Sequence, residues 1–256
     1  MTVVRALVIT GAAGRLGTYL RSSLGDLAES ARLVDIVAPA PPANGEPVTI
    51  YQGSVTDPDL LDRAFDGAEA VVHLGGYPGD APWPELSMVN IGGTREVLEA
   101  ALRHGVKRLV VASSNHAVGF QVRGPEPLAD DVAPMPDSLY GVTKAAGEAL
   151  CRFYSLQHGL DVVCLRIGSC FDAPTNRRML STWLSPADFV RLTEAALTAP
   201  TPGFRLVWGV SANTRRWWST TGGEALGFRP EDNAERFAEL YPGSTPEPEN
   251  VGGVTI

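Results

Sequence analysis

Short apolar runs alternate along the chain with longer segments whose apolar residues recur every three or four positions. Several of the runs are uniformly apolar, as expected for parallel strands covered by helices on both faces. They predict strands over residues 3–10, 32–37, 48–52, 70–74, 108–112 and 161–167. The longer segments predict helices over residues 16–24, 58–65, 84–104 and 139–158. This alternation predicts an α/β fold with a doubly wound parallel sheet, a Rossmann fold.

The pattern is looser in the last third of the chain. The elements expected there are a helix, a strand before a Trp-rich loop and a last helix, over residues 186–199, 206–209 and 233–241. We expect one Rossmann-type domain over residues 1–256, divided into a core, a small C-terminal lobe that covers a substrate, and a tail, at about 1–168, 169–245 and 246–256. The Pro- and Gly-rich sequence from residue 242 onwards predicts a mobile tail.

Composition and charge restrict the partners. The chain is 44% hydrophobic and 20% charged, as is usual for globular proteins. Its formal net charge of −8 works against nucleic-acid binding, which needs clustered Lys and Arg. The N-terminal apolar run is too short to span a membrane, and no small-residue cleavage site follows it. We therefore expect a cytoplasmic protein without nucleic-acid or membrane partners.

The three cysteines are odd in number and lie in apolar surroundings. They have neither the paired spacing nor the neighbouring histidines of a metal site. We expect Cys151, Cys164 and Cys170 to be reduced thiols of the core, and we expect no metal.

A glycine-rich turn follows the first predicted strand. Glycines at 11, 14 and 17 permit a tight turn, close approach of the backbone to a pyrophosphate, and close packing of the following helix. Asp35 follows at the end of the second strand, where a carboxylate accepts hydrogen bonds from the adenosine ribose. The first 168 residues are therefore predicted to bind a dinucleotide, through Gly11, Ala13, Gly14, Arg15, Leu16, Gly17 and Asp35.

The same residues bear on the choice of cofactor. The carboxylate of Asp35 would repel a 2′-phosphate, which favours NAD over NADP. Arg15 could instead hold that phosphate, or it could be a solvated helix residue. The expected cofactor is NAD.

A second motif is the Tyr-x-x-x-Lys of Tyr140 and Lys144. Residues four apart share one face of a helix, so the phenol and the ammonium would project together. A nearby cation stabilises the phenolate, which could then accept a proton. Taken alone the motif would more often be an ordinary exposed helix face. Its position after a strand that ends in Ser114 favours a catalytic site.

These motifs carry a family resemblance. The TGxxGxxG opening, the Ser-bearing strand end, YxxxK and "VNIGGT" resemble the extended branch of the short-chain dehydrogenase/reductase superfamily. More narrowly, the chain resembles the uronate (hexuronate) dehydrogenases in "HLGG", "ASSNHAVG", "YGVTK", "RIGSC", "RRMLSTWLSPADFV", "VWGVSANTRRWW" and "LGFRPEDNAE". This likeness extends over nearly the whole chain and fades in the tail.

The resemblance implies NAD-dependent oxidation of a sugar acid, glucuronate or galacturonate, at its anomeric C1. It implies a catalytic set of Ser114, Tyr140 and Lys144. It implies substrate binding by Ser114, Asn115, His116, Tyr140, Ser169 and Arg178. It adds further cofactor contacts from Leu74, Gly75, Gly76, Asn90, Tyr140 and Lys144, with Asn90 supporting the lysine through water.

Purely structural interpretations of these residues, the duller ones, are also open. Ser114 could be a strand-end cap, His116 a satisfied structural imidazole, and Arg178 a solvated neighbour of Arg177. The tryptophans that follow residue 182 are expected to be core or subunit contacts without a catalytic part. The chain also departs from the family pattern, with Ser54 where an acid usually contacts adenine and Tyr77-Pro78 where a substrate-binding serine is expected.

Two other functions remain open at this point. A nucleotide-sugar epimerase or dehydratase of the same superfamily would keep its NAD bound and release no NADH. A non-catalytic dinucleotide sensor would not need Ser114, Tyr140 and Lys144 together. Members of the superfamily often pair through the helices predicted over 84–104 and 139–158, so we expect a homo-oligomer.

Overall fold

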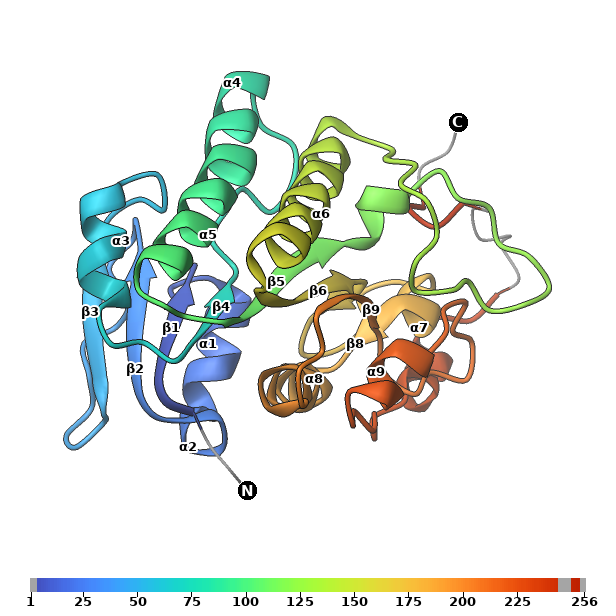
Figure 1. The fold of residues 1–256 in the computed structure, drawn as a ribbon. Coiled ribbons are helices and arrows are strands. Elements are labelled where there is room, and N and C mark those ends of the chain that lie inside the picture. Colours follow the sequence, from blue (N-terminus) through green and yellow to red (C-terminus); the bar gives the residue numbers. More distant parts are fainter. Residues whose placement is uncertain (1–3, 244–249, 254–256) are drawn as a thin grey trace.

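A parallel sheet forms the centre of the computed structural model, which describes residues 4–243 and 250–253. Within these residues it has seven strands in the order β3-β2-β1-β4-β5-β6-β9 (Figure 1). The expected doubly wound α/β fold is confirmed. The strands are β1 Val4–Thr10, β2 Ala28–Asp35, β3 Val48–Gln52, β4 Ala70–His73, β5 Arg108–Ser114, β6 Asp161–Ile167 and β9 Phe204–Gly209.

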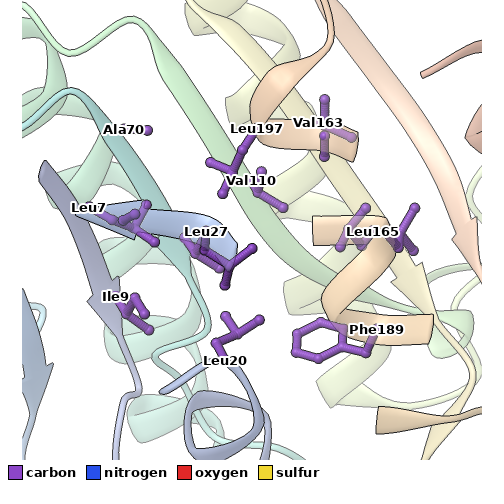
Figure 2. Close-up of a cluster of buried hydrophobic side chains, with 14 of the residues drawn as sticks. Leu7, Ile9, Leu20, Leu27, Ala70, Val110, Val163, Leu165, Phe189 and Leu197 are labelled. Carbon is purple, nitrogen blue, oxygen red and sulfur yellow. The ribbon is translucent and has the colours of Figure 1, made fainter. Parts of the chain in front are cut away.

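Helices cover both faces of the sheet (Figure 1). One face packs against α3 Pro58–Phe65, α5 Thr94–Arg103 and α6 Leu139–His158. The other packs against α1 Arg15–Ser22, α2 Leu24–Leu27 and α8 Pro186–Thr198. Figure 2 shows this second cluster, in which strand side chains meet helix side chains, among them Leu7, Ile9, Val110 and Leu165 with Leu20, Leu27 and Phe189. Both faces of the strands are therefore buried, which explains their uniformly apolar sequences.

Several boundaries differ from the prediction. β2 begins at Ala28 and ends at Asp35, because pairing with β1 starts at Val4 and carries the polar Glu29 and Ser30 into the strand. The predicted helix over 16–24 divides into α1 and α2, and the last helix is a 3₁₀ helix, η3 Ala234–Leu240. Residue 3, the predicted start of β1, lies outside the described residues.

The helix predicted over 84–104 is not continuous. It consists of α4 Trp83–Leu86, the π-helical turn η1 Ser87–Gly93, and α5. The wider turn lets the side chain of Asn90 reach the backbone of Tyr77 and the hydroxyl of Thr143. Single π turns of this kind are frequent at functional sites.

The region after residue 168 contributes to the main layers. β9 pairs with β6 as the edge strand, and α8 packs under the sheet. What remains outside these layers is β7 Ser169–Cys170, α7 Met179–Thr182, β8 Trp183–Leu184, α9 Thr221–Ala225 and η3. Trp183, Trp208 and Trp218 are buried in this region, as expected for core residues.

Part of the tail predicted to be mobile is held in place. The backbone of Val251 donates to Gln121 O, and that of Gly252 donates to Gly119 O. Val251 is fully buried. The prediction of mobility was wrong for this segment, because its glycines allow the backbone to approach residues 119–121 closely. The rest of the predicted tail, 244–249 and 254–256, lies outside the described residues.

The state of the cysteines and the character of the helices relate to two expectations from the sequence. Cys151, Cys164 and Cys170 are buried free thiols. Within the described residues, no helix has both the length and the apolar character needed to cross a membrane.

A buried ion pair joins α6 to the sheet. Both nitrogens of one edge of the Arg166 guanidinium donate to Glu148, at 2.9 and 2.8 Å, and neither side chain is more than 5% exposed. Ser113 at the end of β5 donates to the same carboxylate at 2.6 Å. The remaining Arg166 nitrogen donates to Asp130 O and Val132 O. Every charged atom of the pair therefore has a partner, as a buried pair requires.

Removing one member of this pair should strongly destabilise the folded protein. Arg166→Met leaves the Glu148 carboxylate buried without its cation, so we expect the free energy of unfolding to fall by about 3–5 kcal/mol in urea denaturation. Arg95→Met, at an exposed ion pair on α5, is the matched control and should lose much less. Equal losses in the two variants would contradict a special role for the buried pair.

Candidate active site

The glycine-rich turn lies where β1 meets β4 at the carboxyl edge of the sheet. Gly11 has a φ of +70°, and a Cβ there would lie 2.7 Å from Gly75 N. A Cβ on Gly17 would lie 2.6 Å from the Cα of Ala12. Both positions therefore need glycine, one for the turn and one for the approach of α1. This crevice is the switch point where open α/β sheets bind dinucleotides, so the residues fit the expected cofactor.

Asp35 and Arg15 lie on different sides of this turn. The Asp35 carboxylate ends β2 and accepts from Ala13 N at 2.9 Å and from Val37 N at 3.0 Å. Arg15 turns the other way, donates to Cys170 O, and stacks 3.9 Å from the Phe171 ring. The guanidinium is thus engaged away from the carboxylate that would face the adenosine ribose.

Leu74, Gly75 and Gly76 form the turn after β4. Asn90 fixes this turn, because its Oδ1 accepts from Tyr77 N at 2.8 Å and its Nδ2 donates to Thr143 Oγ1 at 3.0 Å. A Cβ on Gly76 would lie 2.8 Å from Asn90 Oδ1. Asn90 and Lys144 both line an internal cavity of about 10 Å³, near the smallest size that holds one water.

A buried relay of hydrogen bonds runs behind the turn, centred on His73. Thr94 Oγ1 donates to Asn90 O, so it must accept from His73 Nε2, 3.1 Å away. The other ring nitrogen, Nδ1, lies 2.7 Å from Thr10 Oγ1, which accepts from Gly75 N. Burial, and secondarily the charge of Lys144, lower the pKa of His73 to about 3. His73 is therefore neutral, and through Thr10 and Thr94 it joins β1, β4 and α5.

The proposed catalytic side chains meet where β5 passes into the 3₁₀ turn η2 Asn115–Val118. A Cβ on Gly141 would lie 2.3 Å from His116 O, so glycine lets α6 pack directly on this turn. The rings of His116 and Tyr140 consequently lie 6.0 Å apart, edge to face. Lys144 Nζ lies 5.6 Å from the Tyr140 ring and donates to Ala112 O at 2.9 Å.

The polar residues that follow β5 are also bound to one another. Ser114 belongs to β5, two residues beyond the predicted end, and its Oγ accepts from His116 N at 3.2 Å. It therefore does cap the turn, as the duller interpretation holds, and a hydroxyl oxygen keeps a second lone pair for a ligand. Asn115 Nδ2 donates to Val251 O at 3.2 Å. His116 Nδ1 lies 2.9 and 3.0 Å from the two carboxylate oxygens of Asp137.

Ser169 and Arg178 both follow β6, Ser169 on β7 and Arg178 directly before α7. Ser169 Oγ lies 3.0 Å from Thr182 Oγ1 in a buried contact. Arg178 is not simply solvated, because it donates to Val251 O and its guanidinium lies 5.5 Å from the Trp217 ring. Val251 O thus accepts from both Asn115 and Arg178, so the C-terminal segment 250–253 reaches the expected substrate residues.

Three parts of this site were not predicted from the sequence. His73 in "HLGG" carried no predicted role, Asp137 was not singled out, and residues 250–253 were predicted to be mobile. An acidic residue three positions before Tyr140 was the available signal for Asp137. Nothing local to the sequence signals the docking of 250–253, since its partners lie far away in the chain. Among the described residues, no three His, Cys, Asp or Glu side chains are grouped to hold a metal.

Comparisons with known proteins show the family of the chain. The model of the NAD-dependent epimerase/dehydratase family matches residues 7–199. Uronate dehydrogenase of Agrobacterium fabrum is 42% identical over 246 residues, which cover 96% of this chain and 92% of that protein.

Two solved structures are similar over nearly their whole length. A glucuronic acid dehydrogenase from Chromohalobacter salexigens has a TM-score of 0.92 and 36% identity, with 98% of this chain and 96% of that chain covered. A mutant uronate dehydrogenase of Agrobacterium tumefaciens in complex with NAD has a TM-score of 0.89 and 41% identity, with 97% and 96% covered.

The neutral state of His73 has a consequence for stability at low pH. In the unfolded chain this histidine takes up a proton below its ordinary pKa of 6.5, whereas in the folded protein it does so only near 3. The unfolded state therefore gains protons first, and stability falls as pH drops from about 6.5 towards 3. The fall attributable to His73 should approach 1.4 kcal/mol per pH unit.

Urea denaturation at several pH values measures this contribution. His73→Asn should lack that part of the slope, whereas His158→Asn, at an exposed position, should keep it. The same slope in wild type and His73→Asn would show that His73 does not cause the acid sensitivity.

Proposed function

Because the chain belongs to the uronate dehydrogenases of the NAD-dependent epimerase/dehydratase family, we propose that it oxidises glucuronate or galacturonate at the anomeric C1. It is an NAD-dependent oxidoreductase. The product of the proposed reaction is the aldarolactone. The observation that carries the proposal is the packing of α6 on η2, which brings Tyr140 beside the polar end of β5 and Lys144 next to Tyr140.

Tyr140 is the proposed base. As phenolate it takes the proton of the C1 hydroxyl, while Ser114 Oγ holds that oxygen. Lys144, anchored on Ala112 O, places a positive charge near the phenol that stabilises the phenolate. Bound NAD, held by the glycine-rich turn, Asp35 and the 74–76 turn, supplies the acceptor for the C1 hydride.

Arg178 and Ser169 are the proposed carboxylate contacts. A guanidinium presents paired donors that match a carboxylate, and Arg178 is linked to Asn115 because both donate to Val251 O. Asn115 and His116 would contact the sugar hydroxyls between these two ends. A sugar held at both ends has its C1 fixed relative to Tyr140, which is how binding lowers the barrier.

The proposal includes the expected homo-oligomer. Apolar side chains are exposed on η1 and α6, at Met88, Leu139, Phe153 and Leu156. These elements belong to the two predicted pairing helices, and burial of such side chains favours association.

The test is the absorbance of NADH after the protein is mixed with NAD and glucuronate or galacturonate. We expect NADH with either uronate, none with glucose, and little with NADP. Glucose lacks the carboxylate but keeps the anomeric centre, so it isolates the part played by Arg178 and Ser169. Tyr140→Phe should abolish turnover with NAD affinity largely unchanged, because only the proton acceptor is removed.

Each contrary outcome has a distinct meaning. NADH with glucose but not with uronates would refute the carboxylate contacts. Substantial activity of Tyr140→Phe would remove Tyr140 from its role. Tightly retained NAD without NADH release would favour an epimerase that acts on nucleotide sugars, and ordinary NAD affinity without turnover would favour a sensor.

A further inference from the structure

Asp137 is a buried carboxylate beside the proposed active site that the mechanism above does not use. Its side chain is fully buried, and both of its oxygens lie within 3.0 Å of His116 Nδ1. It directly precedes Ser138, which caps α6 by accepting from Gly141 N. The positive end of the helix dipole stabilises a negative charge at this position. These contacts are complementary to a negatively charged carboxylate.

Two glycines close the space around this carboxylate. A Cβ on Gly119 would lie 2.1 Å from Asp137 Cγ, and a Cβ on Gly252 would lie 1.5 Å from Asp137 Oδ2. Gly252 N donates to Gly119 O at 2.8 Å, which holds the C-terminal segment 250–253 against this position. The segment therefore seals Asp137 from water, and any side chain at residue 252 would displace it.

The contact fixes the protonation pattern of the imidazole. An ionised carboxylate only accepts hydrogen bonds, so Nδ1 of His116 must carry the hydrogen. In the neutral ring Nε2 then bears a lone pair and is directed away from Asp137. The His116 side chain is 35% exposed, whereas Asp137 is 0% exposed, so the ring reaches from the buried carboxylate to the accessible site.

We propose that Asp137 is a positioning residue that, sealed by Gly252, holds His116 with Nε2 ready to accept a hydrogen bond from a sugar hydroxyl. The identity of the sugar rests on the proposed function. Val251 O accepts from Asn115 and Arg178. The segment 250–253 therefore contacts these two side chains directly and acts on His116 through Asp137. Asp137 acts on substrate affinity through His116 and does not take part in the transfer of the proton or the hydride.

Two variants and one control separate this role from general stability. Asp137→Asn replaces the carboxylate, which can only accept from His116, by an amide that can also donate. Gly252→Ala pushes the C-terminal segment 250–253 away from the carboxylate. Gly124→Ala is the matched control, because the nearest atom to its new Cβ is 4.0 Å away. Denaturation in urea identifies any variant that is only destabilised.

The first measurement is nitrogen-15 NMR of the imidazoles in the protein without substrate. The chain has four histidines, and a His116→Gln variant assigns the signal of His116. We expect the Nδ1–H form in wild type and Gly124→Ala, and appearance of the Nε2–H form in Asp137→Asn. An Nε2–H form in the wild type, or no change in Asp137→Asn, would overturn the proposal.

The second measurement is the kinetics of uronate oxidation. Asp137→Asn and Gly252→Ala should raise KM for the uronate about ten-fold, the loss of one hydrogen bond, with kcat within a few-fold and NAD affinity unchanged. A fall in kcat and NAD affinity as large as the rise in KM would mean a purely structural role and overturn the proposal. If the wild type oxidises no uronate, the proposed function fails, and the NMR result alone decides whether Asp137 sets the state of His116.

Discussion

The buried pair of Glu148 and Arg166 is the constraint on which the arrangement of the site depends. A charge taken out of water is tolerable only if every one of its polar atoms is bound, so the pair fixes the positions of its partners. Those partners are Ser113 at the end of β5 and the carbonyls of Asp130 and Val132 in the loop before α6. Glu148 lies one helical turn beyond Lys144, so the register of the proposed catalytic helix is set from inside the core.

The polar side chains of the relay at the carboxyl edge of the sheet likewise all have hydrogen-bond partners. The relay through Thr10, His73 and Thr94 joins β1, β4 and α5, and Asn90 on η1 extends it to Tyr77 after the 74–76 turn and to α6. Buried polar networks of this kind give rigidity when every member is satisfied. The cofactor turn and the proposed catalytic helix are thereby parts of one hydrogen-bonded body, although they come from opposite halves of the sequence.

The fold could be predicted from sequence because its determinants are local. Uniform apolar runs gave six strands of the sheet, and glycines at 11 and 17 marked a turn that no other residue fits. Features that depend on distant contacts were missed or misjudged: the π turn around Asn90 depends on Thr143, and the docking of Gly252 depends on Asp137. Motifs singled out Ser114, Tyr140 and Lys144 as the candidate catalytic residues, whereas the side chains that contact them are visible only in three dimensions.

The surroundings of the Trp217 indole give the protein an optical property. The indole lies 4.2 Å from the guanidinium of Arg123 and 5.5 Å from that of Arg178, and it meets the ring of Trp218 edge to face. Indole emission shifts in wavelength and intensity with the electric field around the ring. If a substrate carboxylate binds Arg178 as proposed, it would change that field, and the emission of Trp217 would then report this binding without any turnover.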